Sequence, residues 1–330
     1  MKNLLKKIRT LIPVTKELSN HFNVHGIKNI FLFLDYIYCL KILHFSIKEY
    51  KAYNIFNNRK NRKDFLLIYH QQNFIKKVNP REYTRYKYKV YQQLQKYFKR
   101  EVILIPDCGF EQFYMFLQNH KKVIIKPNGG SCARGIFIYN FEDVDKAKEL
   151  FFSFEEQMVC EEYIKQAELF SQMHSESVNS IRVVSIYDNG EAKIQSASLK
   201  IGKGDSFVDN MTKGGLGANI DIDTGIIDTD GFDYAGNVFL KFPDTEIKIK
   251  GLQLPNFDKV LNTVKEAHIQ FSDCPILGWD LAVLENDVCV IEVNNAPGPL
   301  LMQVFDKKPK GKNILKYIKE HEKSIKTYNN

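Results

Sequence analysis

The chain has 330 residues, 44% of them apolar and 26% charged, which excludes a disordered or low-complexity protein and allows one large or two ordinary domains. Its net charge of +8 is unevenly distributed: residues 1–100 hold 22 Lys and Arg against 5 Asp and Glu, so they carry +17 and the other 230 residues carry −9. A first third as basic as this one is typical of a protein that binds an acidic partner, but it is equally compatible with a solvated helical surface.

The cysteine pattern and the hydropathy bear on location. The six cysteines include no Cys-x-x-Cys pair, which indicates reduced thiols. The first residues, Met-Lys-Asn-Leu-Leu-Lys-Lys, do not develop into a secretory signal. Residues 27–47 are the most apolar run, but Lys28, Asp35 and Lys41 interrupt it, and a charge near the bilayer centre costs roughly 3 kcal/mol. We therefore expect a cytoplasmic protein without a membrane-spanning helix.

Residues 1–78 have the pattern of a basic helical region. Residues 4–12 place apolar side chains at helical spacing, and a second apolar run covers residues 30–45. Pro13, Gly26 and the pair Asn57-Asn58 are the natural breaks. A further helix is predicted after Pro80, and the basic tail after Lys307 is predicted to be one surface helix.

From Glu101 the sequence changes to short β-rich runs separated by Gly, Pro and Asn. The predicted strands cover residues 122–126, 135–139, 158–164, 181–187, 192–201, 276–284 and 288–294. Helices are predicted over residues 143–154 and 257–271. Because these strands outnumber the helices that could cross over between them, the pattern favours an α+β fold over a doubly wound parallel sheet.

The predicted hairpin at residues 277–294 is the most informative segment. Side chains in a strand alternate with a period of two, so its odd-numbered apolar residues share one buried face: Leu277, Trp279, Leu281, Val283, Cys289, Ile291 and Val293. A three-residue loop, 285–287, would set Asp280 opposite Glu292 and Gly278 opposite Asn294. Facing carboxylates are unfavourable unless a cation lies between them, and their hard oxygens suit Mg²⁺. The alternative is a solvated acidic edge.

A second segment combines a strand, a loop of small residues and another strand. Lys126 ends the first strand, and the loop includes Gly129, Gly130 and Ser131. Backbone N–H groups in such a loop can form an anion nest, and Lys126 adds a point charge for phosphate. The loop does not match a P-loop, since no Gly-Lys-Ser/Thr follows, and it could equally be a Gly-rich turn.

Taken together, these motifs resemble the ATP-grasp superfamily, and most closely its sugar-transfer-associated branch, whose members are similar to glutamate ligases. The order is the small-residue loop, then Cys160-Glu-Glu-Tyr-Ile164, then Arg182 on a strand, then the hairpin carboxylates. The resemblance covers roughly residues 79–299. It implies two α+β lobes that close on ATP, preceded here by a helical N-terminal extension.

The resemblance also implies roles for individual residues. Lys126 and Arg182 would be the catalytic cations on the ATP phosphates, below the loop with Gly129, Gly130 and Ser131. The adenine edge and the ribose would be bound by Glu161, Glu162, Tyr163, Ile164 and Glu168. Asp280, Glu292 and Asn294 would hold one or two Mg²⁺ ions. A further nucleotide lysine is expected on the helix after Asn79, where Lys87 and Lys89 both fit and Lys89 is favoured. Asp209, Asn210, Gly214 and Gly215 would line the acceptor pocket.

The domains implied are a helical region at 1–78, a small ATP-grasp lobe at 79–164, a large lobe with the magnesium site at 165–306 and a basic tail at 307–330. No separate α/β substrate domain precedes the grasp fold. The function implied is a carboxylate–amine ligase in surface-polysaccharide biosynthesis, which forms an acyl phosphate from ATP and a small carboxylate and passes it to an amine.

Two rival functions remain open from the sequence. One is an ATP-grasp phosphotransferase acting on a sugar hydroxyl, and the other is a non-catalytic protein whose basic third binds an acidic partner. Possible partners are an acidic sugar or glycan and the anionic inner face of a membrane, whereas nucleic acid is disfavoured because it leaves the hairpin carboxylates unexplained.

Overall fold

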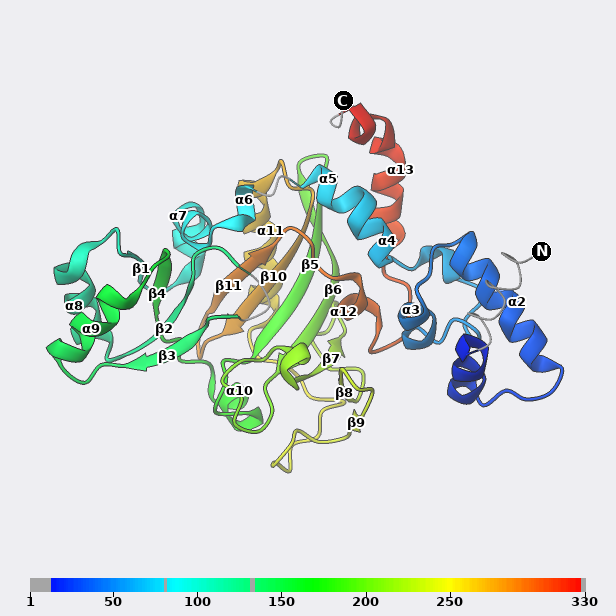
Figure 1. The fold of residues 1–330 in the computed structure, drawn as a ribbon, viewed down its shortest axis with the longest axis horizontal. Helices are drawn as coiled ribbons and strands as arrows, with labels where there is room; N and C mark the ends of the chain where they lie inside the picture. The colour runs from blue at the N-terminus through cyan, green and yellow to red at the C-terminus, as the bar shows by residue number, and fades with distance from the viewer. Residues whose placement is uncertain (1–12, 80–81, 131–133, 328–330) are drawn as a thin grey trace. The chain divides into compact units, whose positions relative to one another are not determined.

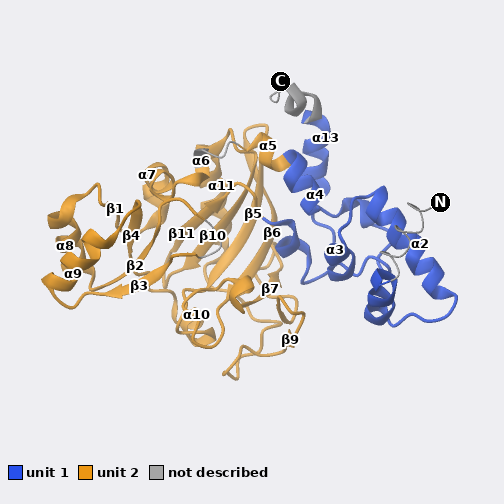
Figure 2. Cartoon of the chain, in the orientation of Figure 1, with its two compact units in different colours: residues 1–74, 298–330 blue, residues 75–297 orange. Residues whose placement is uncertain are grey.

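The computed structural model describes residues 13–79, 82–130 and 134–327. The chain forms two compact units (Figure 2). Unit 1 consists of Met1–Phe74 together with Gly298–Asn330, and unit 2 is Ile75–Pro297. The helix predicted within residues 1–12 lies outside the described residues.

Unit 1 is helical where it is described, as its apolar spacing predicts. Residues 13–22 are helical. The other elements are α2 (Lys28–Lys41), α3 (Ile47–Ala52), η1 (Arg62–Asp64), α4 (Ile68–His70), the π-helical turn η2 (Gln71–Ile75), α12 (Pro299–Gln303) and α13 (Lys312–Thr327). Gln303 joins the two segments of this unit, because its amide accepts a hydrogen bond from Leu66 N and donates one to Leu66 O, at 3.0 and 2.9 Å.

Unit 2 contains a four-stranded and a seven-stranded antiparallel sheet (Figure 1). The smaller sheet has the order β1-β4-β2-β3. Its strands are β1 (Val102–Ile105), β2 (Lys122–Pro127), β3 (Phe137–Asn140) and β4 (Met158–Glu162). Helices α8 (Gly109–His120) and α9 (Val144–Ser153) pack with this sheet around Phe113, Phe116 and Phe151. Helix α8 is not among the elements predicted from the sequence.

The larger sheet has the order β11-β10-β5-β6-β7-β8-β9. Its strands are β5 (Ser180–Asp188), β6 (Glu191–Ile201), β7 (Leu216–Ile220), β8 (Gly231–Asp233), β9 (Val238–Phe239), β10 (Ile276–Val283) and β11 (Val288–Asn294). The remaining helices of unit 2 are α5 (Lys76–Val78), α6 (Glu82–Arg85), α7 (Lys87–Phe98), α10 (Glu168–Met173), η3 (Met211–Lys213), α11 (Phe257–His268) and η4 (Ile269–Phe271). All of these strand pairs are antiparallel, which confirms the α+β class.

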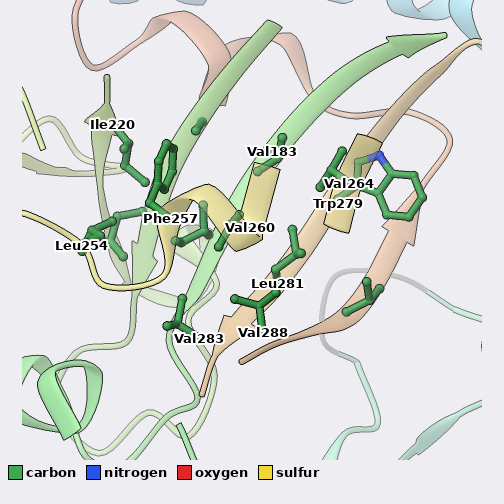
Figure 3. Close-up of a cluster of buried hydrophobic side chains, with 14 of the residues drawn as sticks. Val183, Ile220, Leu254, Phe257, Val260, Val264, Trp279, Leu281, Val283 and Val288 are labelled. Atoms are coloured by element: carbon green, nitrogen blue, oxygen red, sulfur yellow. The ribbon is translucent and has the colours of Figure 1, made fainter. Parts of the chain in front are cut away.

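Helix α11 covers one face of the larger sheet (Figure 3). Val260 and Val264 on the helix pack with Val183, Trp279 and Leu281 on the strands, all of them buried. On the central strands the odd-numbered residues form this core, so the even-numbered side chains project from the opposite face.

The β10–β11 hairpin confirms that Asp280 pairs with Glu292 and Gly278 with Asn294. The predicted three-residue loop is wrong, because Val283 pairs with Val288 and leaves a four-residue turn. A bulge at Ile291 restores the predicted pairing nearer the strand ends. The bulge also inverts the alternation of side chains, so Val288 and Val290 join the core instead of Cys289 and Ile291.

Within residues 13–79, 82–130 and 134–327, none of the helices has the length and hydropathy that a membrane span requires.

A buried chain of polar groups at the C-terminal end of α11 makes the stability of unit 2 dependent on pH. His268 Nε2 donates to Cys274 O at 2.9 Å, Ser185 Oγ lies 2.7 Å from His268 Nδ1, and Trp279 Nε1 donates to Ser185 Oγ at 2.9 Å. With Nε2 as the donor, Nδ1 accepts from the Ser185 hydroxyl, and this arrangement requires a neutral imidazole. Burial accordingly lowers the pKa of His268 to about 4.

We expect acid to destabilise unit 2 through His268. The unfolded histidine takes up a proton below pH of about 6.5, whereas the folded one does so only near 4. Stability is therefore constant above the unfolded pKa and falls by up to roughly 3 kcal/mol as the pH drops through this window. Urea unfolding followed by the fluorescence of Trp279, the single tryptophan, should show a larger loss between pH 7 and 4.5 for wild type than for His268→Gln. Equal losses would contradict this origin.

Candidate active site

A row of polar side chains crosses the face of the larger sheet opposite α11. The strand register places Glu292 opposite Asp280, Asp280 opposite Arg182, and Arg182 opposite Ser198. These four residues come from four adjacent strands, β11, β10, β5 and β6. Because directly paired residues share a face of the sheet, the register brings the predicted metal ligands and the predicted catalytic arginine together.

Arg182 and Asp280 form a bidentate ion pair. Arg182 Nε lies 2.6 Å from Asp280 Oδ1, and Nη2 lies 2.8 Å from Oδ2. Burial opposes the ionisation of Asp280, but Arg182 and Lys200 outweigh it and hold the pKa of that carboxyl well below its usual range. Arg182 Nη1 also donates to Pro297 O at 3.1 Å, which ties the turn after β11 to the guanidinium. The positive charge expected beside the facing carboxylates is therefore supplied, in the case of Asp280, by Arg182 and Lys200 of the protein itself.

Lys200 is a second buried cation at this site, and sequence analysis did not identify it. Its Nζ lies 3.4 Å from Asp280 Oδ1 and 3.3 Å from Asp209 Oδ1. The Ser180 hydroxyl donates to Asp209. A signal was present in the sequence, since Ser196, Ser198 and Lys200 alternate with apolar residues along a predicted strand. That alternation predicts a polar face ending in a lysine.

Glu292 and Asn294 differ from Asp280 in having no fixed partner. No described residue forms a hydrogen bond or an ion pair with the Glu292 carboxylate, and the buried Asn294 Nδ2 has no acceptor. Turning the Asn294 amide would present its oxygen instead. Among the described residues no group of three or more His, Cys, Asp or Glu side chains could hold a metal. Two carboxylates and one amide fit Mg²⁺, whose remaining positions are normally filled by water and phosphate oxygens.

The second half of the site lies on the smaller sheet. Lys126 Nζ is 2.6 Å from Glu161 Oε1, and Arg100 Nη2 is 2.7 Å from Glu161 Oε2. All three side chains are buried. Burial opposes the ionisation of Glu161, but Arg100 and Lys126 outweigh it and lower the pKa of that carboxyl. Arg100 Nη1 also donates to Val290 O at 2.7 Å, so it joins this triad to β11.

Arg100 was not identified from the sequence, because nothing in its local pattern distinguishes it from the neighbouring basic residues.

Lys87, rather than Lys89, lies within the site. Lys87 lines a small pocket together with Glu161 and Glu292, and its Nζ donates to Gly130 O at 3.1 Å. Burial lowers the pKa of Lys87, which Glu292 partly offsets. Lys89 is exposed and its Nζ lies 5.4 Å from the Tyr86 ring centroid. The helix therefore turns Lys87 towards the carboxylates.

The small-residue loop follows β2 directly. Gly129 forms a bridge with Tyr86, which fixes the start of the loop against the start of α7. Asn128 adds two contacts, because its backbone O accepts from Lys87 N and its side chain accepts from Tyr88 N, each at 3.0 Å. Ser131 lies outside the described residues.

The residues expected to contact adenine and ribose lie at the end of β4 and directly after it. Glu162 ends that strand, and Tyr163 and Ile164 begin the link from the smaller to the larger sheet. Ala167 N then donates to Val283 O on β10 at 2.8 Å, which anchors the link. Glu168 is exposed at the start of α10.

The four residues expected to line the acceptor pocket are in different environments. Asp209 belongs to the cluster around Lys200, and Asn210 caps η3 by accepting from Thr212 N. Gly214 has a φ of +97°, which favours glycine. A Cβ at Gly215 would lie 2.7 Å from Ile201 O, so a larger residue does not fit there. Only Asp209 reaches the polar row.

Comparison with solved structures found chains that resemble this one weakly. The chain resembles the D-alanine–D-alanine ligase of Helicobacter pylori, with 14% sequence identity and a TM-score of 0.41 over 72% of this chain and 58% of that one. It also resembles the D-alanine–D-alanine ligase of Bacillus anthracis, with 16% identity and a TM-score of 0.43 over 74% of this chain and 69% of that one. A third similar structure is an N5-carboxyaminoimidazole ribonucleotide synthetase solved as an ADP complex, with 13% identity and a TM-score of 0.42 over 66% of this chain and 46% of that one. The chain thus spans about half of the last enzyme and less than two thirds of the first. A search of curated proteins found no match.

The family comparison is more specific than these similarities of fold. Residues 151–318, just over half of the chain, match the family model described as sugar-transfer associated ATP-grasp. This segment contains Arg182, Lys200, Asp280, Glu292 and Asn294. The chain belongs to the sugar-transfer associated ATP-grasp family.

Proposed function

We propose that this protein is an ATP- and Mg²⁺-dependent ligase that activates a carboxylate as an acyl phosphate and transfers it to an amine. The observation that carries the proposal is the pocket where Lys87, Glu161 and Glu292 meet. Glu161 is paired with the buried Lys126 of the smaller sheet, and Glu292 lies opposite Asp280, the ion-pair partner of Arg182, on the larger sheet. Cations on both sides of a phosphate chain are what phosphoryl transfer requires.

In this proposal the residues of the site divide between nucleotide binding and catalysis. Lys126 and Lys87 bind ATP phosphates, and the backbone of residues 162–164 binds the adenine edge, with Glu168 at the ribose. Arg182 and Lys200 neutralise charge on the transferring phosphoryl group as the substrate carboxylate attacks it. ADP leaves, the amine displaces phosphate from the acyl phosphate, and Arg182 stabilises the oxyanion of that second step.

Asp280, Glu292 and Asn294 are the proposed Mg²⁺ ligands. When bound, the ion would supply charge neutralisation for the phosphate oxygens. Glu292 is the principal ligand of the three, because both oxygens of Asp280 already accept hydrogen bonds from Arg182. Asp280 thereby also holds the guanidinium at the site.

The proposed substrates are a small carboxylate and an amine, one of them an amino acid or an acidic sugar destined for a surface polysaccharide. The family description supports a link to sugar transfer, and two of the structural neighbours are named as ligases of D-alanine. Asp209, held by Lys200 and Ser180, is the proposed contact for the substrate amine.

Lys87→Met is expected to weaken ATP binding by about tenfold or more, as for the loss of a charge-assisted contact worth about 1.5–3 kcal/mol. Lys126→Met should have a similar effect. Lys89→Met is the matched control, two residues along the same helix, and should change the affinity less than about twofold because its side chain is exposed. Calorimetric titration with ATP measures all three, and an effect of Lys89 larger than that of Lys87 would reverse the assignment.

Trapping the intermediate tests the reaction itself. The protein should be incubated with ATP, Mg²⁺, nucleotide-linked uronic acids and a mixture of amino acids, with and without hydroxylamine, and the products analysed by mass spectrometry. A hydroxamate with hydroxylamine and an amide without it are the expected products. A phosphate ester that resists hydroxylamine would identify a sugar phosphotransferase instead, and the absence of any ATP-dependent product would contradict both.

A further inference from the structure

Helix α2 of unit 1 exposes an apolar stripe along its whole length. The stripe consists of Ile27, Ile30, Phe31, Leu34, Tyr38 and Ile42. These residues recur at intervals of three or four, so they lie on one face of the helix. Phe31 is 59% exposed and Ile27 71% exposed. The opposite face, with Leu32, Tyr36 and Cys39, is buried in unit 1.

The stripe is unusual for a surface helix. An amphipathic helix buries one apolar face and shows water a polar one, whereas a helix that is apolar on both faces is normally covered on both. Six of the 15 large exposed apolar residues in the described part of the chain belong to this one helix and its two caps. Scattered apolar residues need no explanation, but a contiguous exposed stripe marks an interaction surface.

The charges around the stripe are positive. Lys28 and Lys41 are exposed at its two ends. Asp35 is the only acidic residue of α2, and it is neutralised by Arg62 at 2.7 Å and Arg59 at 3.6 Å. The Arg62 guanidinium also lies 4.7 Å from the centroid of the Tyr38 ring, which places a cation directly beside the stripe.

The whole of unit 1 has the same sign. Its two segments hold 21 Lys and Arg against 7 Asp and Glu, a formal charge of +14, whereas unit 2 carries −6. The excess charge thus resides in the unit that has the stripe and not in the unit that has the active site. This separation indicates that the charge serves a contact distinct from ATP binding.

These features select among possible occupants of the stripe. A second copy of the chain would bring two units of +14 together, which is unfavourable at ordinary ionic strength. The phosphate backbone of nucleic acid would leave the apolar side chains exposed. A helix of 14 residues is about 21 Å long and cannot span an apolar layer of about 30 Å. An anionic lipid surface satisfies both features, because its acyl boundary accepts the stripe and its headgroups attract the cations.

We propose that α2 lies in the plane of an anionic membrane surface, with its stripe in the acyl boundary and Lys28, Lys41 and Arg59 at the headgroups. Unit 1 then acts as the membrane-binding unit and tethers unit 2, with its proposed ATP site, to the bilayer. The proposal adds a specific docking face to the proposed function and does not depend on which substrates unit 2 uses.

The test is co-sedimentation of the full chain with vesicles of phosphatidylcholine alone and of phosphatidylcholine mixed with phosphatidylglycerol. We expect binding to the anionic vesicles only, reduced at high salt. Phe31→Ser combined with Leu34→Ser should weaken that binding by at least about tenfold, since binding scales with the buried apolar area. Lys28→Glu combined with Lys41→Glu should weaken it similarly. Phe152→Ser, at a phenylalanine 69% exposed on α9 of unit 2, is the matched control and should have no effect.

Insertion can be observed directly with a Phe31→Trp variant. Its emission should shift to shorter wavelength on adding anionic vesicles, after subtraction of the wild-type signal from the buried Trp279. ATP affinity should be unchanged in every stripe variant, so that failure of docking is separable from failure of the ligase proposal. Binding that is lost with the lysine changes but kept in the stripe double variant would overturn the role of the stripe. Equal binding to neutral vesicles, or dimerisation through the stripe in light scattering without vesicle binding, would overturn the lipid proposal.

Discussion

Replacing Glu292 with glutamine is expected to lower ATP turnover at least about a hundredfold while leaving the fold intact. Glu292 faces Asp280 across the β10–β11 ladder, is half-buried, and has no hydrogen-bond partner among the described residues. Glutamine has almost the same volume, so packing is preserved, and it removes a charge repelled by Asp280. A lost metal ligand costs several kcal/mol of transition-state stabilisation, and each 1.36 kcal/mol is a factor of ten in rate.

Steady-state ATP hydrolysis or product formation at saturating Mg²⁺ measures this effect, and urea unfolding checks the fold. Glu191→Gln is the matched control, because it makes the same chemical change at an exposed position of the same sheet. The control should retain wild-type turnover. Turnover of Glu292→Gln within about threefold of wild type would exclude Glu292 as a metal ligand.

Asp280→Asn is expected to lose activity and also to destabilise unit 2 by about 3–5 kcal/mol. The substitution leaves the half-buried Arg182 and the buried Lys200 without their shared carboxylate. Removing one partner of a buried ion pair costs this much because the remaining charge is uncompensated. The two facing carboxylates are therefore expected to differ: Glu292→Gln should affect activity alone, whereas Asp280→Asn should affect both activity and the stability of the fold.

Urea unfolding monitored by Trp279 fluorescence tests the difference. Asp287→Asn is the control, because its partner Lys99 is about as exposed as the aspartate itself, and loss of an exposed ion pair costs less than about 1 kcal/mol. Adding Lys200→Met to Asp280→Asn should recover part of the loss, since it removes one uncompensated cation. No recovery, together with a loss no larger than in the control, would show that Asp280 does not stabilise the cluster.

The pH dependence of the free energy of unfolding in acid is a second test of the role of Asp280. Because the folded pKa of Asp280 is lowered, its contribution is fully present above the unfolded pKa of about 3.9 and is lost as the pH falls below that value. The stability of Asp280→Asn should therefore fall less steeply below about pH 4 than that of wild type. The loss of stability due to His268 occurs mostly at higher pH, between about 6.5 and 4. The two effects can therefore be measured separately.

The sequence alone determined the features that depend on local pattern. Period-two alternation on both sides of a short turn predicted that Asp280 faces Glu292, and the pairing is present even though the loop length was wrong. The turn is one residue longer than predicted and a bulge at Ile291 adds one residue to β11, so the two errors cancel at the site. The strand prediction over residues 192–201 also came within one residue of β6. The family resemblance came from such motifs, which are contiguous in the chain.

Only the tertiary structure decided the partners of those residues. The choice of Lys87 over Lys89 depends on which side of α7 packs against the pocket, and a pitch of 3.6 residues separates these two side chains by about 200°. Lys200 and Arg100 meet Asp280 and Glu161 from strands and turns 80 and 61 positions away. Residues 298–330 form one compact unit with residues 1–74, and the hydrogen bonds between Gln303 and Leu66 connect two positions that are 237 residues apart. Contacts at such separations leave no periodic trace in a single sequence, because they are selected by packing of the whole chain.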